Sequence, residues 1–305
     1  MFVSILIPTY NNEKLFRRLL FSILSQSYNN FEVIVCDDSN NNSIQKEVLL
    51  ADDARVYYYK NQSQLGSPQN WNRCLDMAKG QLIKFMHHDD FFANQNSLAI
   101  FVDYFQKNLN CDFVFCNSVH VDRNEKVVST YAISQNNLKK LQSTPSYIFP
   151  YNIIGAPSVT CFRPTNLRFD SKLKWVVDID YYFYYMKTNR IGYINEGLIK
   201  IQTDLESRVT NQCVDNKDIE LFEWGYLYNK INTSHSTTIR QKLYMISFFA
   251  NYKIFSLKQL FLIFNKNKLG VYSEIDFKLL FIGVWVFRKL KRCKVLLIRM
   301  MLLCK

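Results

Sequence analysis

The chain has 305 residues, of which 48% are hydrophobic, and it contains only 8 Gly and 6 Pro. This composition excludes a disordered, collagen-like or linker-like chain and is sufficient for one large core or two smaller ones. The formal net charge of +12 favours an anionic partner, so nucleic acid, anionic lipid and phosphorylated ligands are the classes to separate.

The chain begins with a short apolar run, residues 1–10, that lacks a basic leading segment and contains a proline. We therefore expect a first β-strand there and not a signal peptide. The 8 Cys show no CxxC spacing, which is typical of reduced, mostly buried thiols in a cytosolic protein. Both observations predict a cytoplasmic protein.

Strand-like runs alternate with helical patterns from residue 1 to about residue 117, which indicates βαβ units and a mainly parallel sheet. The expected strands cover residues 3–7, 31–36, 55–60, 81–86 and 112–117. Helices are expected over residues 15–24, 68–79 and 98–105. Asn11 and Asn12 are candidate caps of the first helix, Pro68 suits a first helical turn, and Gly80 suits the position after a helix end.

The pattern becomes less regular beyond residue 117. A polar stretch over residues 134–146 predicts a loop, residues 157–162 predict a strand, and residues 191–202 are expected to be extended. From about residue 215 to the end, apolar residues recur at helical spacing. We therefore expect an α/β domain over residues 1–214 and a helical region over residues 215–305.

Basic residues crowd the end of the chain among bulky apolar ones, and no acidic residue follows Asp276. The apolar runs 279–287 and 295–303 are shorter than the roughly 20 residues that cross a bilayer. An amphipathic helix on an anionic membrane surface is the favoured interpretation, and a helix packed on the core is the alternative. Nucleic acid is not expected as a partner, because the basic residues do not alternate with stacking aromatics along a groove.

Two acidic pairs follow two of the expected strands. Asp37 and Asp38 come after the strand over residues 31–36, and Asp89 and Asp90 come shortly after the strand over residues 81–86. Open α/β sheets bind ligands at the carboxyl ends of their strands, so we expect the two pairs to share one site. Because Asp also favours turns, two simple turns are the alternative.

Five motifs in order resemble the inverting family 2 glycosyltransferases with the GT-A fold. They are Ile7 to Asn11, Ser22 to Tyr28, Val35 to Ser39, Asn70 to Arg73 with Ala78 to Gly80, and His87 to Asp90. No single motif is specific, but the ordered set in its strand and helix context is. The resemblance covers about the first third of the chain and implies a GT-A (Rossmann-like), mainly parallel α/β sheet sandwiched by helices, here with a C-terminal helical extension.

The resemblance also implies a nucleotide diphosphate sugar donor, with UDP as the expected nucleotide. The implied nucleotide-sugar contacts are Pro8, Thr9, Tyr10, Asn11, Asp38, Asn70, Arg73, His88, Asp89 and Arg208. Asp38 would accept a hydrogen bond from the base, and Asp90 would be the ligand of Mn²⁺ or Mg²⁺, which neutralises the diphosphate. The commonest family motif has Asp where this chain has His87, so that position departs from the family.

The segment Val177 to Tyr181 resembles the acidic region of the family that holds the catalytic base, and it places Asp178 at that role. Asp180 is the second candidate, and Val177 stands where the family has Glu. A positioned carboxylate lowers the barrier by taking the proton of the acceptor hydroxyl. The alternative is that both acids only cap a helix.

The predicted function is therefore an inverting hexosyltransferase that acts on a lipid-linked or oligosaccharide acceptor, such as an undecaprenyl-diphosphate-linked glycan, in bacterial surface polysaccharide synthesis. O-antigen, capsule and lipooligosaccharide are all compatible products. The expected location is the inner face of the cytoplasmic membrane. A nucleotidyltransferase and a non-catalytic, basic nucleic-acid-binding protein are the alternatives, although the sequence has no GxxxxGK[ST] or GxGxxG motif.

Overall fold

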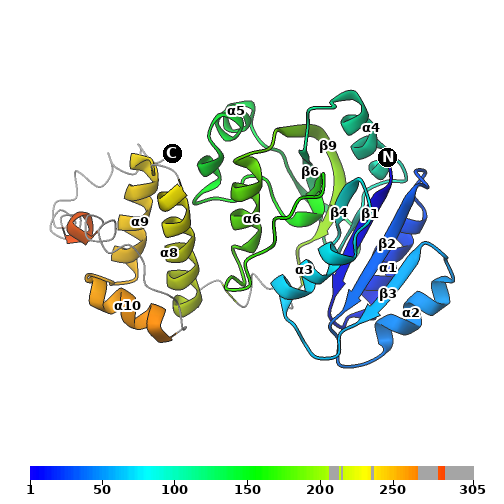
Figure 1. Ribbon diagram of the computed structural model, residues 1–305, viewed down its shortest axis with the longest axis horizontal. Coiled ribbons are helices and arrows are strands. Elements are labelled where there is room, and N and C mark those ends of the chain that lie inside the picture. Colours follow the sequence, from blue (N-terminus) through cyan, green and yellow to red (C-terminus); the bar gives the residue numbers. More distant parts are fainter. Residues whose placement is uncertain (206–212, 214–215, 235–236, 267–280, 286–305) are drawn as a thin grey trace. The chain divides into compact units, whose positions relative to one another are not determined.

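The computed structural model describes residues 1–205, 213, 216–234, 237–266 and 281–285 (Figure 1). The chain forms two compact units. The first contains Met1–Pro145 and Asn152–Glu206, and the second contains Ser146–Tyr151 and Ser207–Lys305. The predicted boundary at residues 214–215 lies outside the described residues.

The first unit is built on a single mixed sheet. Its strands are β1 (Val3–Thr9), β2 (Phe31–Asp37), β3 (Val56–Lys60), β4 (Leu82–Phe85), β5 (Asp90–Phe92), β6 (Phe113–Val121), β7 (Val127–Tyr131), β8 (Thr160–Phe162) and β9 (Ile191–Gln202). The strand order is β3-β2-β1-β4-β8-β6-β9-β5, and β7 pairs with β6. The pairs β3–β2, β2–β1, β1–β4 and β6–β9 are parallel, whereas β8 is antiparallel to both of its neighbours. This arrangement confirms the predicted α/β fold.

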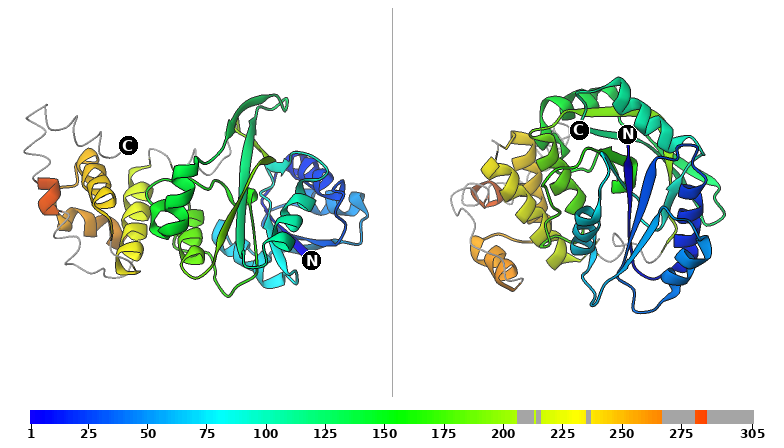
Figure 2. Two further views of the ribbon diagram at one scale, coloured as in Figure 1. Left: turned by 90° about the horizontal axis from the view of Figure 1, so that it is seen from above. Right: turned by 45° about the vertical axis from the view of Figure 1, so that its right-hand side comes forward.

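Helices accompany both faces of this sheet. They are α1 (Glu13–Leu24), α2 (Ser43–Ala51), α3 (Ser67–Met77), α4 (Ser97–Lys107), α5 (Gln135–Ser143) and α6 (Val177–Met186). Figure 2 shows α1 and α2 on one side of the strands β1 to β3 and α3 on the other. This follows from right-handed crossovers, because the chain steps outward from β1 to β3 and then returns past them to β4.

Two of the predicted local signals are confirmed. Asn12 caps α1, since its side-chain oxygen accepts a hydrogen bond from the backbone N–H of Leu15 at 3.4 Å. Pro68 lies in the first turn of α3, where its missing N–H leaves no backbone acceptor unsatisfied. The sequence chemistry therefore sets where these two helices begin.

The predicted role of Gly80 is wrong, because α3 ends at Met77 and is followed by an extended Ala78. Gly80 instead packs tightly against the first strand. A Cβ atom at this position would lie 2.4 Å from the backbone nitrogen of Ser4, so only glycine fits. The glycine serves a close backbone approach and not a helix end.

The predicted loop over residues 134–146 is also wrong, because it contains helix α5. Ser134 caps this helix by accepting from Asn137 N at 3.2 Å, and Leu138 and Leu141 bury one face. The strand predicted over residues 157–162 is shorter, since a 3₁₀ turn, Pro157–Val159, precedes β8. Proline cannot donate to a strand ladder, which explains the late start.

The second unit is helical, as predicted, over the residues that the structure describes. It contains α8 (Lys217–Ser234), α9 (Ile239–Asn251) and α10 (Leu257–Lys266). Thr238 and Gln241 form a reciprocal capping box at the start of α9. The buried Phe149 packs against the rings of Trp224, Tyr228 and Tyr244, with centroids 5.6 to 6.0 Å away.

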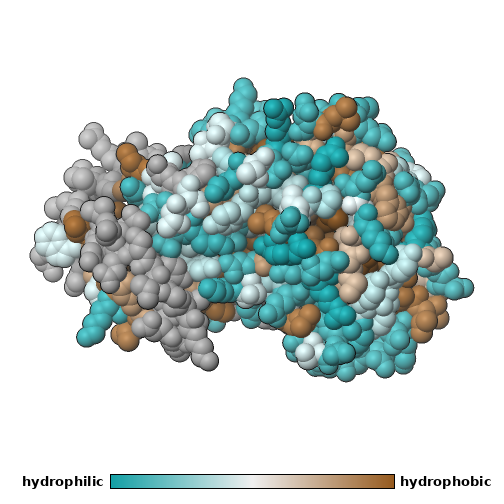
Figure 3. Space-filling view, in the orientation of Figure 1, coloured by the Kyte–Doolittle hydropathy of each residue, from teal (hydrophilic) through white to brown (hydrophobic). Residues whose placement is uncertain are grey.

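No helix within the described residues is both long and apolar enough to cross a membrane. The basic segment 288–305 and residues 279, 280, 286 and 287 of the apolar run lie outside the described residues. On the face seen in Figure 3, hydrophilic residues predominate over the first unit, with separate apolar patches among them.

Candidate active site

The carboxyl ends of β1, β2 and β4 meet at one edge of the sheet. The strands are adjacent and parallel, and Thr9 at the end of β1 is in register with Asp37 at the end of β2. Beyond β4, Met86 continues the ladder by donating to Leu6 O at 2.9 Å. The structure thus brings together the two acidic pairs and the residues after β1, as expected for an open α/β site.

The turn after β1 presents unsatisfied polar atoms at this edge. The side-chain oxygens Oγ1 of Thr9 and Oδ1 of Asn11 are buried, and neither has a hydrogen-bond partner among the described residues. Tyr10 between them is 41% exposed, whereas Pro8 lies inside β1 opposite Cys36. Because buried polar atoms normally have partners, Thr9 and Asn11 fit a ligand that supplies them.

Asp38 is buried and organises the loop that leads into α3. Its Oδ1 accepts from Asn61 Nδ2 at 2.6 Å and from Leu65 N at 2.8 Å, and its Oδ2 accepts from Gly66 N at 2.9 Å. Gly66 has a φ of +81°, a conformation that favours glycine. Since an ionised carboxylate has about four acceptor sites, the described residues leave one of them on Oδ2 unfilled.

Asn70 and Arg73 on α3 both contact Asn61, a residue that sequence reasoning did not select. Asn70 accepts from Asn61 Nδ2 at 2.9 Å and donates to Cys36 O, and Arg73 donates to Asn61 Oδ1 at 2.6 Å. Asn70 is only 3% exposed, so these contacts hold the loop around Asp38. Asn61 follows β3, whose carboxyl end lies at the same edge of the sheet. Its position just after a predicted strand was the sequence feature that could have identified it.

Asp37 is fully buried and bonded within the protein. Lys60 Nζ and Tyr58 OH donate to its Oδ2 at 2.9 and 2.7 Å, and Ser39 N donates to its Oδ1 at 2.9 Å. Burial, and then the bond to this carboxylate, raise the pKa of Tyr58 above its ordinary value. Asp37 therefore fixes the end of β2 and leaves Asp38 as the acid that faces the turn.

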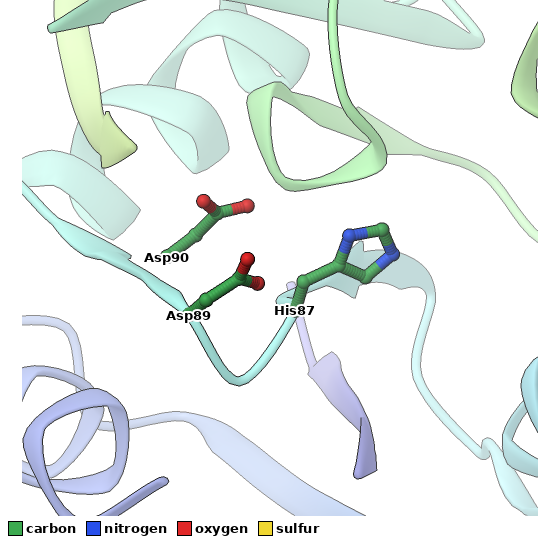
Figure 4. A group of neighbouring side chains, drawn as sticks. All are labelled: His87, Asp89 and Asp90. Carbon is green, nitrogen blue, oxygen red and sulfur yellow. The ribbon is translucent and has the colours of Figure 1, made fainter. Parts of the chain in front are cut away.

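The loop after β4 carries a cluster with the chemistry of a metal site. His87, Asp89 and Asp90 each offer one ligand atom, and these atoms lie within 4.8 Å of one another (Figure 4). One imidazole and two carboxylates suit a divalent cation, so the residues present fit the metal that the GT-A fold typically uses. His88 beside them is half-buried. Sequence reasoning selected Asp90 alone as the metal ligand, placed Asp89 among the nucleotide-sugar contacts, and did not include His87.

Neighbouring side chains hold this loop in place. The indole of Trp71 packs on the His87 ring with centroids 4.8 Å apart, and the backbone N–H of His87 donates to Ser158 Oγ at 3.0 Å. Arg18 donates from one end of its guanidinium to Asp89 O at 3.0 Å and from the other to Gln202 at 2.9 Å. The loop is therefore tied to α3, to the turn before β8 and to the end of β9.

Asp178 lies in the first turn of α6 and is half-buried. Its Oδ2 accepts from Asn152 Nδ2 at 2.7 Å, and its Oδ1 accepts from Ile179 N at 2.8 Å. Asp180 is only 3% exposed, so Asp178 is the more accessible of the two acids. Neither acid is the N-cap residue, which is Val176. Arg208 and its neighbours lie outside the described residues.

This fold and this acidic edge define a transferase of the GT-A class. Residues 4–159 match the family described as Glycosyl transferase family 2, and the chain belongs to that family. The predicted glycosyltransferase identity and fold are confirmed.

Several known proteins are similar to this chain. An uncharacterized glycosyltransferase of Rickettsia typhi is 26% identical over 78% of this chain and 75% of its own length. The UDP-Glc:alpha-D-GlcNAc-diphosphoundecaprenol beta-1,3-glucosyltransferase of Escherichia coli is 29% identical over 65% of this chain and 74% of its own.

A solved structure shares the fold. S. aureus TarS 1-349 in complex with UDP-GlcNAc matches 84% of this chain and 74% of its own with a TM-score of 0.62 and 18% identity. A mannosyltransferase from Pyrobaculum calidifontis, solved with GDP-Man and Mn²⁺, matches with a TM-score of 0.54 and 13% identity over 93% of this chain and 86% of its own.

Proposed function

We propose that this glycosyltransferase moves a sugar from a nucleotide diphosphate sugar, with UDP as the nucleotide, to a hydroxyl of a lipid-linked or oligosaccharide acceptor. The observation that carries the proposal is the shared edge of β1, β2 and β4, where unsatisfied Thr9, buried Asp38 and the cluster around His87 lie together. Relatives named as glucosyltransferases acting on diphosphoundecaprenol-linked sugars support this acceptor class.

The nucleotide would bind at the turn after β1. Thr9 and Asn11 offer buried oxygens that lack partners among the described residues, and the exposed ring of Tyr10 offers a face for the base. The remaining acceptor site of Asp38 suits a base N–H, because a charge-assisted bond to a carboxylate is strong. Asn70 and Arg73 would act through the loop that they hold, and His88 and Arg208 remain proposed contacts of the phosphates.

His87, Asp89 and Asp90 would hold a divalent cation. When bound, the cation neutralises the charge that grows on the leaving diphosphate. We propose Mn²⁺ over Mg²⁺, because Mg²⁺ takes oxygen ligands almost exclusively whereas a nitrogen ligand is acceptable to a transition metal.

Asp178 would act as the general base in a single displacement. Its carboxylate takes the proton of the acceptor hydroxyl, the hydroxyl oxygen forms a bond to the anomeric carbon, and the bond from that carbon to the phosphate oxygen breaks. The bonding electrons leave with the nucleoside diphosphate. Attack from the face opposite the leaving group inverts the anomeric carbon.

We also propose that the protein works at the inner face of the cytoplasmic membrane, in surface polysaccharide synthesis. The basic residues 288–294, set among apolar ones, support attraction to anionic lipid. Replacing Arg288, Lys289 and Lys291 by Gln should reduce flotation of the full chain with phosphatidylglycerol vesicles. Equal flotation of the variant and the native chain would count against this location.

Release of nucleoside diphosphate from UDP sugars, in the presence of Mn²⁺ and lipid-linked acceptor, tests the activity. Asp178→Asn should lower kcat by about 10²- to 10⁴-fold and leave donor affinity unchanged, because only the base is removed. A rate close to that of the native enzyme would show that Asp178 is not the base. Release of pyrophosphate from a nucleoside triphosphate would instead support a nucleotidyltransferase.

A further inference from the structure

The segment Asn152–Ser158, which precedes β8, connects Asp178 with the loop that carries His87. Its first residue bonds to the Asp178 carboxylate, and its last accepts the His87 N–H. Nothing in the sequence motifs pointed to Asn152. The contacts of Asn152 determine how the carboxylate of the proposed base is oriented.

The orientation of the Asn152 amide is fixed by four hydrogen bonds. Its Oδ1 accepts from Ile154 N at 3.1 Å and from Gly155 N at 2.9 Å. Its Nδ2 donates to Gly155 O at 3.0 Å and to Asp178 Oδ2 at 2.7 Å. An amide that is turned over would set its NH₂ group against two N–H donors, so Nδ2 must point at the carboxylate.

The turn that holds Asn152 is itself rigidly built. Gly155 has a φ of +111°, which favours glycine, and its carbonyl also accepts from Tyr182 OH at 3.2 Å. Tyr182 lies on α6, the helix whose first turn holds Asp178, so turn and helix are joined at two points. Asn152 is therefore set by its surroundings and not by Asp178 alone.

Two donors hold the carboxylate of Asp178, one on each oxygen. Asn152 holds Oδ2, while the backbone of Ile179 holds Oδ1. These bonds orient the plane of the carboxylate. Asp178 is half-buried, so part of its side chain is exposed to an acceptor hydroxyl.

The far end of the segment, Ser158, is anchored beside His87, Asp89 and Asp90. Ser158 is fully buried, its hydroxyl accepts from His87 N at 3.0 Å, and its carbonyl accepts from the ammonium of Lys84 on β4. Lys84 also lies 5.0 Å from the ring centroid of Phe101. The same seven residues thus touch the proposed base at one end and the backbone of His87 at the other.

We infer that Asn152 is a positioning residue for sugar transfer, which aims the Asp178 carboxylate at the acceptor hydroxyl from a segment fixed to the His87 loop. This inference rests on the proposed function of Asp178. Misplacement of a reacting group by about 1 Å lowers rates by about 10²-fold, so the loss of this bond should be visible in kcat.

The test compares Asn152→Ala and Asn152→Asp with the native enzyme. The aspartate keeps the oxygen that Ile154 and Gly155 bond to, and it replaces the donor by a second carboxylate oxygen that repels Asp178. Both variants should lower kcat by roughly 10- to 100-fold and leave donor affinity unchanged, because each removes the donor that orients Asp178. Asn94→Ala, which removes a similar exposed turn acceptor for Asn96 N, is the matched control and should keep native kcat.

A double-mutant cycle separates this inference from the assignment of the base. If Asn152 acts through Asp178, adding Asn152→Asp to Asp178→Asn should lower the residual rate by less than two-fold. The inference would be overturned if the two single-variant losses in kcat multiplied in the double variant. It would also be overturned if both Asn152 variants kept native kcat. Either result would leave Asp178 as the base. Native kcat in Asp178→Asn itself would instead overturn the proposed base.

Discussion

The imidazole of His87 packs against the indole of Trp71, with the ring centroids 4.8 Å apart and the planes inclined by 39°. Trp71 also meets Phe169 edge to face at 5.0 Å, so its own position is fixed. A residue that orients a metal ligand contributes to affinity without touching the metal.

Trp71→Ala should weaken Mn²⁺ binding by about 10-fold, because the His87 ring loses its support. Trp71→Phe retains an aromatic face and should lose much less. Calorimetric titration of each variant with Mn²⁺ measures the effect. Equal affinities in the native protein and Trp71→Ala would show that the stack does not orient His87.

His87 should bind Mn²⁺ directly through nitrogen. Pulsed EPR spectroscopy of the Mn²⁺-loaded protein should then detect ¹⁴N coupling from a directly bound imidazole, and His87→Asp should abolish it. The same substitution should raise the affinity for Mg²⁺ relative to Mn²⁺, because it replaces nitrogen by the oxygen that Mg²⁺ prefers. Persistence of the coupling in the variant would assign the nitrogen to another residue.

Lys84→Met should change how stability depends on pH. Burial lowers the pKa of Lys84 from 10.5 to about 8, so between these values the unfolded chain binds more protons than the native protein. The contribution of Lys84 to the free energy of unfolding therefore rises as the pH increases from about 8 to 10.5, by roughly 3 kcal/mol over about two pH units.

Urea unfolding of both proteins at pH 7.5, 9 and 10 measures this difference. The native protein should gain stability relative to Lys84→Met as the pH increases. A constant difference across the series would show that Lys84 titrates normally in the fold. Because other groups titrate in both proteins, only the difference between them is informative.

Gly80→Ala should destabilise the first unit by roughly 1–3 kcal/mol, since the added methyl group would overlap the backbone of Ser4. Thermal unfolding measures the loss as a lower melting temperature. Lys79→Ala is the control, because Lys79 is exposed beside it and should change stability little. Equal melting temperatures for the native chain and Gly80→Ala would mean that β1 moves to make room.

The strands and most helices of the first unit could be predicted because their apolar residues follow local periods. The errors came where local polarity misleads. Helix α5 is polar except for Leu138 and Leu141, and the three-residue β5 directly continues the acidic motif at Asp90. Its pairing with β9 depends on a partner more than one hundred residues away, which no local pattern reveals.

The residues of the candidate site could likewise be predicted only in part. Motifs located Thr9 at the end of β1, Asp38 just after β2 and Asp90 after the loop that follows β4, because topology alone brings the ends of such strands together. They did not reveal Asn61 or Asn152, whose importance arises from side-chain bonds to Asp38 and Asp178 across 23 and 26 positions of sequence. Such partners are set by packing in three dimensions.

The six residues Ser146–Tyr151 belong to the helical unit although both flanking segments belong to the α/β unit. An enzyme engineer who exchanged helical units between relatives at a single junction near residue 206 would leave Phe149 behind, stripped of Trp224, Tyr228 and Tyr244. Such a chimera would display an orphaned aromatic side chain and tend to aggregate. A viable exchange has to carry this hexapeptide together with the helices that enclose it.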